Sequence, residues 1–302
     1  MVRGRERVRE IAGRYVKQIL DHDVPGLAAE LAYRFMFATF PFAIFVVALS
    51  GFMAGWLGIA DPSSRIIGAI GNSLPADLIG PVKDQLEHAL AETEPQLLSV
   101  GAVVTLYAAT GGIDTLMKAM NRAYGVPETR PIVTRIALAA LLTVLGGAAV
   151  VVSFVAVVGG TLVTQRLIDG IGLGQVWPAI SLLRWPIAFA LLVAAVSALL
   201  RYAPSYRTPW RWAAVGATVF AIVWLVVTYG FGLYVARFAS YGATYGALAG
   251  VIVLMLWFYL TAFVLLSAAE LAALLAGPGT QRAAAAAGLP TAPRSSAAPA
   301  AD

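Results

Sequence analysis

The sequence contains no cysteine, so it can form no disulfide bond, and no thiol can act as a nucleophile or a metal ligand. Histidine occurs only twice, at His22 and His88, which leaves little imidazole for catalysis or metal binding. No GxGxxG or Walker-type glycine loop is present to support nucleotide binding. We therefore expect no metal and no cofactor, and we expect that the chain is not an enzyme.

Charge is also scarce. Asp, Glu, Lys and Arg make up 12% of the 302 residues, against about 25% in an ordinary soluble domain. Hydrophobic residues make up 60%, and the mean hydropathy is +0.80. The long uncharged runs leave no stretch for a soluble core, which indicates a polytopic membrane protein. We attribute the net charge of +5 to basic loops that face anionic lipid, and not to nucleic-acid binding.

Six charge-poor segments are each close to or above the roughly 20 residues needed to cross a hydrocarbon core. They are residues 35–57, 96–113, 136–165, 179–200, 212–236 and 247–269. We predict an all-α fold, a polytopic membrane protein with six transmembrane helices in a domain that spans residues 27–276. The segment 179–200 is the weakest of the six, because it contains Arg184 and Pro186.

Three regions flank or interrupt this domain. Residues 1–26 are basic and have apolar residues at helical spacing, which predicts an amphipathic cytosolic arm that lies on the membrane or packs on the protein itself. The external loop 58–95 is predicted to form interfacial helices; within it, we interpret Asp84, His88 and Glu92 as a solvated face and not as a metal site. Residues 277–302 are rich in Ala, Pro, Gly and Ser, which predicts a disordered cytosolic tail.

Lys and Arg are distributed unequally between the two predicted sides. Fifteen lie in the N-terminal arm, in the loops after the second and fourth segments, and in the tail, whereas five lie in or beside the opposite loops. Cytoplasmic loops of membrane proteins carry the excess of positive charge. We therefore predict that both termini are cytosolic, which agrees with an even number of membrane helices.

Charged residues recur at the predicted cytosolic ends of the segments. Our candidates for lining a cytosolic cavity are Glu30, Arg34, Asp114, Arg201 and Glu270. Charges at membrane depth are costly and commonly face a cavity or one another. Such a cavity would bind a charged or zwitterionic headgroup; snorkelling anchors and structural ion pairs are the alternative.

Helix-breaking and small residues mark the same segments. Pro41 is predicted to interrupt the first segment and Pro186 the fourth, while Gly111 and Gly112 are predicted to loosen the end of the second. Gly242, Gly246 and Gly250 form a GxxxGxxxG run, which predicts close contact between helices, within one chain in preference to a dimer. The oligomeric state is left open.

Several motifs together resemble the YihY/virulence factor BrkB family of bacterial inner-membrane proteins, over residues 20–276. They are Ala29-Glu30-Leu31-Ala32-Tyr33 with Pro41; Asn121-Arg122-Ala123-Tyr124-Gly125 with Glu128, Arg130 and Pro131; Tyr202-Ala203-Pro204 with Trp210 and Gly216; Tyr241 and Tyr245-Gly246; and Trp257-Phe258-Tyr259 with Ala269-Glu270-Leu271. Ala268 is a departure, since the family often has glycine there. The resemblance implies a six-span inner-membrane protein of poorly defined activity.

Two functional hypotheses follow from these patterns. The first is a transporter or lipid translocator that binds anionic lipid or a small charged solute within the bilayer. The second is a non-transporting scaffold that organises envelope machinery through the external loop or the tail. Some members of the family were once labelled ribonuclease BN, but this sequence has neither a histidine pair nor a metal-ligand cluster to support a nuclease.

Overall fold

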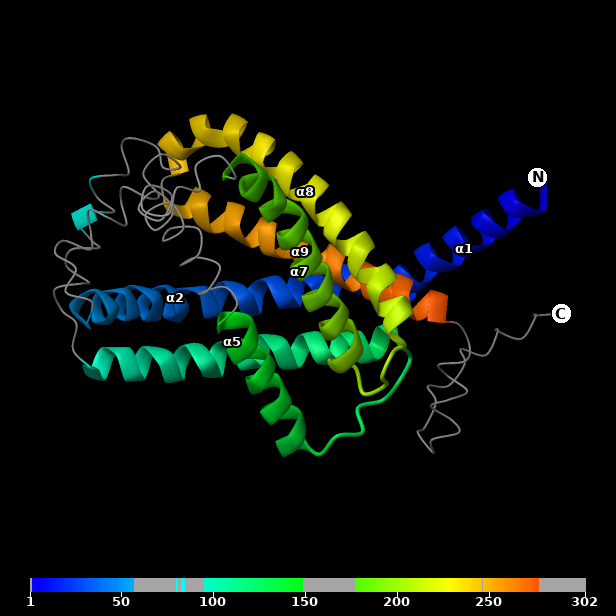
Figure 1. The fold of residues 1–302 in the computed structure, drawn as a ribbon, viewed down its shortest axis with the longest axis horizontal. Helices are drawn as coiled ribbons and strands as arrows, with labels where there is room; N and C mark the ends of the chain where they lie inside the picture. The colour runs from blue at the N-terminus through cyan, green and yellow to red at the C-terminus, as the bar shows by residue number, and fades with distance from the viewer. Residues whose placement is uncertain are drawn as a thin grey trace. The chain divides into compact units, whose positions relative to one another are not determined.

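A computed structural model describes residues 2–56, 80, 83, 84, 95–148, 177–245 and 247–276, and the side chains within most of these ranges. Every regular element in this part of the chain is a helix (Figure 1). The helices are α1 (Val2–Asp21), α2 (Val24–Trp56), α5 (Pro95–Ala123), Ile132–Ala148, α7 (Trp177–Tyr202), α8 (Trp210–Tyr245) and α9 (Ala247–Ala276). The predicted all-α class is therefore confirmed over the described residues.

The helices divide between two compact units. The first unit comprises Met1–Tyr33, Asp114–Ile136 and Leu183–Asp302, and the second comprises Arg34–Ile113 and Ala137–Leu182. In the second unit, α2 and α5 meet at Phe35 and Gly112. Their contact is close at Gly112, where a Cβ atom would lie 3.1 Å from the Phe35 ring.

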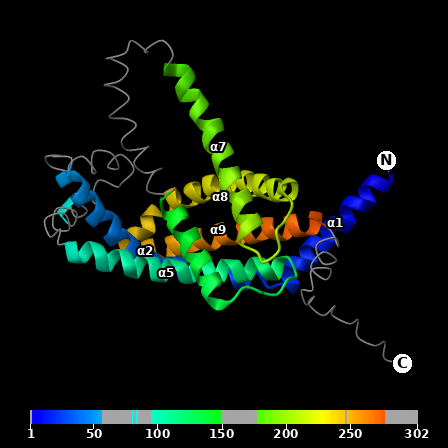
Figure 2. The ribbon, with the colours of Figure 1, turned by 60° about the horizontal axis from the view of Figure 1, so that its bottom comes forward.

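The first unit is built on the pair α8 and α9, which pack along one another (Figures 1 and 2). A Cβ atom at Gly216 would lie 2.9 Å from the Ala272 Cβ and 3.0 Å from the Ala268 carbonyl oxygen. Small residues let membrane helices approach in this way. The core beside this pair is apolar and fully buried; its largest members include Leu31, Met117, Met120, Leu200 and Leu266.

Two helices of the described chain are long and apolar enough to cross a membrane. They are Trp210–Ala236 and Ala249–Ala276, with mean hydropathies of 2.1 and 2.4. Within the apolar 18-residue window of each helix, only 11% and 17% of the residues are buried inside the protein. This low burial distinguishes the two helices from the core helices of a soluble domain. Together they confirm the fifth and sixth predicted segments as helices of membrane length.

The prediction of six membrane helices is confirmed in part. The first, second and fourth predicted segments lie in α2, α5 and α7, but each includes residues whose side chains are outside the described part. The third segment extends beyond Ala148 into residues that the structure does not describe. The interfacial helices predicted for loop 58–95 and the tail 277–302 also lie outside the described residues, apart from residues 80, 83, 84 and 95.

The predicted helix breaks are not observed. α2 continues through Pro41 and α7 through Pro186, while α5 continues past Gly111 and Gly112 as far as Ala123. Proline is tolerated in membrane helices because neighbouring groups satisfy the freed carbonyls. Gly112 instead permits the close contact with Phe35 described above, whereas a Cβ atom at Gly111 would meet only the Arg34 guanidinium, at 3.6 Å.

The glycine run at the start of the sixth segment has a different outcome. Gly242 lies within α8, and Gly246 is outside the described residues. A Cβ atom at Gly250 would meet no described atom within 4 Å. The close helix contact predicted at Gly250 is therefore not made within the described part of this chain.

The N-terminal arm is helical, as predicted, and packs on the protein. The Tyr15 hydroxyl of α1 donates a hydrogen bond to the Ser267 carbonyl of α9 (3.0 Å). Val16 and Leu20 remain 56% and 66% exposed. Of the two alternatives for this helix, packing on the protein is thus observed, and the exposed apolar residues leave a face that can also contact lipid.

Candidate functional site

The loop after α5 begins with a glycine turn that fixes the direction of the chain. The Gly125 amide donates to the Arg122 carbonyl and the Val126 amide to the Asn121 carbonyl, both at 3.0 Å. This pattern ends a helix with a residue in the left-handed region, and Gly125 has φ of 61°. The turn sends residues 126–131 back along the end of the helix, where Asn121 is buried.

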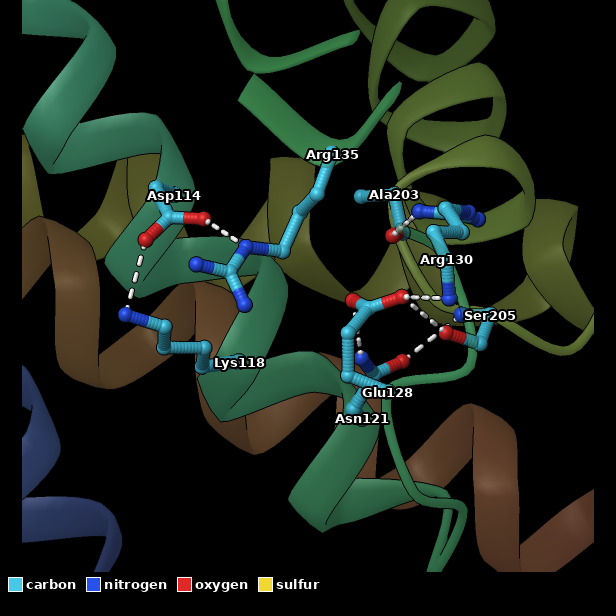
Figure 3. A network of polar contacts seen from close by, with 8 residues as sticks. All are labelled: Asp114, Lys118, Asn121, Glu128, Arg130, Arg135, Ala203 and Ser205. Carbon is cyan, nitrogen blue, oxygen red and sulfur yellow. Dashed lines mark hydrogen bonds and ion pairs between the residues drawn. The ribbon is translucent and has the colours of Figure 1, made fainter. Parts of the chain in front are cut away.

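Glu128 connects this loop to the loop between α7 and α8 (Figure 3). Its Oε2 accepts a hydrogen bond from Asn121 Nδ2 at 2.8 Å, and its Oε1 accepts from Ser205 Oγ at 2.8 Å and from the Arg130 amide at 3.0 Å. The Ser205 amide donates to Asn121 Oδ1 at 2.6 Å. Both oxygens of the carboxylate and both ends of the Asn121 amide are therefore bonded.

Arg130 completes the same network by capping α7. Its guanidinium donates to the carbonyl oxygens of Ala203 (3.0 Å), Tyr202 (3.2 Å) and Pro204. The last carbonyls of a helix have no partner within the helix, so a cation at this position satisfies them and interacts favourably with the helix dipole. We call Asn121, Glu128, Arg130 and Ser205, with these carbonyls, the loop clamp.

Asp114 forms a separate group of ion pairs (Figure 3). Its Oδ2 lies 2.7 Å from Lys118 Nζ, one helical turn further on, and its Oδ1 lies 2.7 Å from Arg135 Nε. Lys118 is 52% exposed, whereas Arg135 is 21% exposed. Arg135 lies in the first turn of the helix Ile132–Ala148, so this group joins that helix to α5. The arrangement favours a structural role for Asp114.

Arg201 is held by its own surroundings at the end of α7. Its guanidinium donates to the Thr208 carbonyl at 2.6 Å. It also lies over the Trp210 and Tyr202 rings, 5.0 and 5.7 Å from their centroids. Cation–π contacts of this kind stabilise an arginine beside aromatic residues. Glu30 and Arg34, the remaining candidates on α2, are exposed.

Glu270 differs from all of these, because its side chain is only 1% exposed and lies inside the apolar helix α9. One oxygen, Oε1, is 2.6 Å from Nδ1 of His22. The other, Oε2, is buried and has no hydrogen-bond partner among the described residues. Buried polar atoms are nearly always paired, so an unpaired carboxylate oxygen calls for an explanation.

His22 is held in position by the tight turn between α1 and α2. Its amide donates to the Gln18 carbonyl at 2.9 Å, and the Asp23 amide donates to the Leu20 carbonyl at 3.1 Å. Asp23 has φ of 52°, a left-handed conformation that Asp tolerates better than most residues. The imidazole is 26% exposed, so it lies between solvent and the buried Glu270.

Further polar groups surround this pair. The charges of Glu270 and Arg122 both act on His22, and the charge of Glu270 also acts on Tyr15 and Tyr124. We call these five residues the Glu270 cluster. Buried oxygens without a hydrogen-bond partner in the described chain recur in or beside it: Glu270 Oε2, Ser267 Oγ and Gln18 Oε1.

The cluster shifts the pKa values of its groups outside the membrane helices. The hydrogen bond to the Glu270 carboxylate raises the pKa of His22 above its ordinary value of 6.5. Burial raises the pKa of Tyr124 to about 12, and burial also raises the pKa of Tyr15. Both tyrosines therefore favour their protonated form, and the contact with Glu270 favours the protonated form of His22.

Three of the five predicted cavity residues have different partners. Asp114 pairs with Lys118 and Arg135, Arg201 bonds to the Thr208 carbonyl, and Glu270 bonds to His22. Sequence reasoning missed His22, Tyr124 and the clamp residues as parts of a site. Asn121, Glu128 and Arg130 lie within the motifs that carry the family resemblance, so that signal was available for them, whereas no local pattern singled out Ser205 or His22.

Comparison with known proteins shows which family this chain matches. The family model described as Virulence factor BrkB matches residues 15–289. A Bacillus subtilis protein named as ribonuclease-like, YfkH, is 31% identical over 89% of this chain and 94% of its own length. A UPF0761 membrane protein of Alteromonas mediterranea is 28% identical over 87% of this chain and 87% of its own length. Another, of Paraburkholderia xenovorans, is 29% identical over 83% of this chain and 56% of its own length. No solved structure matches.

Proposed function

Because this chain is a membrane protein that belongs to the virulence factor BrkB family, we propose that it is a transporter of the bacterial inner membrane. It moves a lipid or a small charged solute across the bilayer and catalyses no covalent chemistry. In this proposal six helices cross the membrane, both termini are cytosolic, and the binding site opens on the cytosolic side and is centred on Glu270.

Glu270 is the observation that carries the proposal. Its buried carboxyl group lies in the helix Ala249–Ala276, whose mean hydropathy of 2.4 is the higher of the two membrane-length helices. Acidic residues within membrane helices are costly to insert and usually mark a substrate or ion pathway. Its Oε2 is buried and has no hydrogen-bond partner among the described residues, which leaves one acceptor position unused.

The contacts between loops support the proposed topology. His22, which follows the basic arm, meets Glu270 near the end of α9, and Arg130 meets the carbonyls at the end of α7. The arm, the loop after α5, the loop after α7 and the end of α9 are the regions that the charge distribution assigns to the cytosol. In the proposed topology, two membrane helices separate each of these regions from the next, so all four lie on the same side of the membrane, where the excess of positive charge belongs.

The proposal is tested by reconstituting the purified protein into liposomes. We expect it to move fluorescent phosphatidylglycerol between leaflets, or a small charged solute across the bilayer, and we expect Glu270→Gln to abolish the movement. Thr261→Val is the matched control: it removes a polar group from the same helix, at its contact with Trp224 (3.2 Å), away from the cluster. This control should retain activity.

Two results would decide against the proposal. Loss of activity in both variants would show damage to α9 in general. Absence of any movement across a broad panel, from protein with an intact thermal transition, would favour the alternative of a membrane scaffold. A scaffold should retain a stable partner in a pull-down through loop 58–95 or tail 277–302, and deletion of the tail or replacement of the loop should release that partner.

A further inference from the structure

The surroundings of Glu270 restrict the kind of ion that this site can bind. The groups that act on Glu270 or on its partner His22 come from α1 and the following turn, from the end of α5, and from α9 itself. They are Tyr15, Asp21, His22, Arg122, Tyr124 and Ser267. Only Asp21 adds negative charge, and it is exposed. Glu270 is the one buried carboxylate of this set.

A metal cation fits these surroundings poorly. Mg²⁺ and Ca²⁺ prefer a shell of several oxygen ligands with more than one carboxylate. Here the Oε1 position is already occupied by an imidazole nitrogen at 2.6 Å, and the positive charge of Arg122 acts on both His22 and Glu270. A proton needs no such shell, because one donor and one acceptor within hydrogen-bond distance are enough to hold it.

The His22 and Glu270 side chains differ in their exposure to solvent, and this difference sets the route by which a proton reaches the pair. The His22 side chain is 26% exposed and can exchange a proton with water, whereas the Glu270 side chain is 1% exposed and cannot do so directly. A proton that reaches Glu270 from the arm side therefore passes through the imidazole. Histidine is suited to this step because its charge changes near physiological pH.

We propose that His22 and Glu270 form the proton-binding site of this protein, with His22 as the group that exchanges the proton with solvent. The inference rests on the proposed transport function, for which it supplies the coupling ion. In the protonated state the imidazolium Nδ1–H donates to the Glu270 carboxylate. Release transfers one proton to solvent water and leaves a neutral imidazole beside the carboxylate.

Proton release also weakens the attachment of α1 to α9. Two of the described polar contacts join this helix and its following turn to α9: the His22–Glu270 pair and the hydrogen bond from Tyr15 to the Ser267 carbonyl. Deprotonation removes the charge attraction from the first contact and leaves the second, which is between neutral groups. Charge-assisted hydrogen bonds are roughly twice as strong as neutral ones, so the protonation state of His22 controls how firmly the turn after α1 is held.

The chain offers a direct measurement, because it has only two histidines. In a His88→Gln background, His22 is the one imidazole, and its nitrogen signals in ¹⁵N-histidine-labelled protein report its titration. We expect a midpoint above 6.5 in detergent micelles. Glu270→Gln should lower this midpoint by removing the carboxylate acceptor, whereas Asp21→Asn, which removes an exposed neighbouring charge, should change it much less.

A midpoint at or below 6.5 in the background protein would overturn the proposal without any reliance on the Glu270 variant. An unchanged midpoint in folded Glu270→Gln protein would do the same. Intact folding of that variant is checked by its circular dichroism and its thermal transition.

Transport in liposomes tests the proton coupling and the transport function separately. Pyranine inside the vesicles reports proton entry, and fluorescent phosphatidylglycerol reports lipid movement. We expect an imposed inward proton gradient to change the rate of lipid movement several-fold in the wild type, and not in His22→Gln. Lipid movement that ignores the gradient would overturn proton coupling and leave the transporter proposal intact. A His22 signal coupled to Glu270 without any transport would instead sustain the proton site and overturn the transport function.

Discussion

Arg130 shows how one side chain can join two loops. Its guanidinium satisfies three carbonyls at the end of α7, while its backbone amide donates to Glu128 in its own loop. Lysine carries the same charge but lacks the planar group with five donors. The position therefore requires arginine for its geometry as well as for its charge.

Arg130→Lys should lower the free energy of unfolding by about 2–4 kcal/mol, because it leaves carbonyls of Tyr202, Ala203 or Pro204 without their charged donor. Thermal unfolding in detergent measures the effect. Thr129→Ala, at an exposed position in the same loop, should have almost no effect. Equal stability of the two variants would contradict the capping role.

His22 gives a pH dependence of known sign. Its pKa is raised in the folded protein, so its contribution to stability is fully present below its unfolded value of about 6.5. That contribution is lost as the pH rises through the higher folded value. The difference in melting temperature between wild type and His22→Gln should therefore be largest at pH 6 and shrink toward pH 9. A difference that grows with pH would show that the imidazole is held neutral.

At the scale of elements, the pair α8 and α9 depends on a missing side chain. Gly216 lies where a Cβ atom would be 2.9 Å from Ala272 and 3.0 Å from a backbone carbonyl. Contacts this short to a neighbouring helix require the helices to separate. The family resemblance includes Gly216, and the structure supplies a physical reason for glycine at this position.

Gly216→Ala should therefore destabilise the protein by about 1–3 kcal/mol, the range for overpacking a close contact. Gly250→Ala is the matched control, because its added methyl group meets no described atom within 4 Å. The same measurement of thermal unfolding compares the two variants. A larger loss from Gly250→Ala would indicate that this glycine packs against another copy of the chain or another partner.

At the scale of the whole molecule, the proposed topology can be tested by cysteine labelling. The chain has no cysteine of its own that would react with the label. Single cysteines are introduced at Gly13 in α1, at Ser64 in the external loop and at Ser296 in the tail. A membrane-impermeant maleimide applied to intact spheroplasts should label only Ser64→Cys. Gly13→Cys and Ser296→Cys should react after the membrane is opened; labelling of either in sealed cells would place that terminus outside.

Sequence alone was sufficient for the properties that depend on composition and local pattern. Apolar runs of membrane length predicted the helices, because an uncharged segment of about 20 residues satisfies its backbone only as a helix in lipid. The scattered motifs indicated the family, which the match over residues 15–289 confirms. The charge distribution supports an orientation that stays a prediction.

Tertiary structure decided which polar residues meet. His22 and Glu270 are 248 positions apart, and Asn121 and Ser205 are 84 apart, so no local pattern could pair them. Their contact depends on how each helix is rotated about its axis and on where each turn points. Tertiary structure also decided the role of Gly112. The helix α5 continues through Gly111 and Gly112, and the absence of a side chain at Gly112 lets α5 pack closely on Phe35.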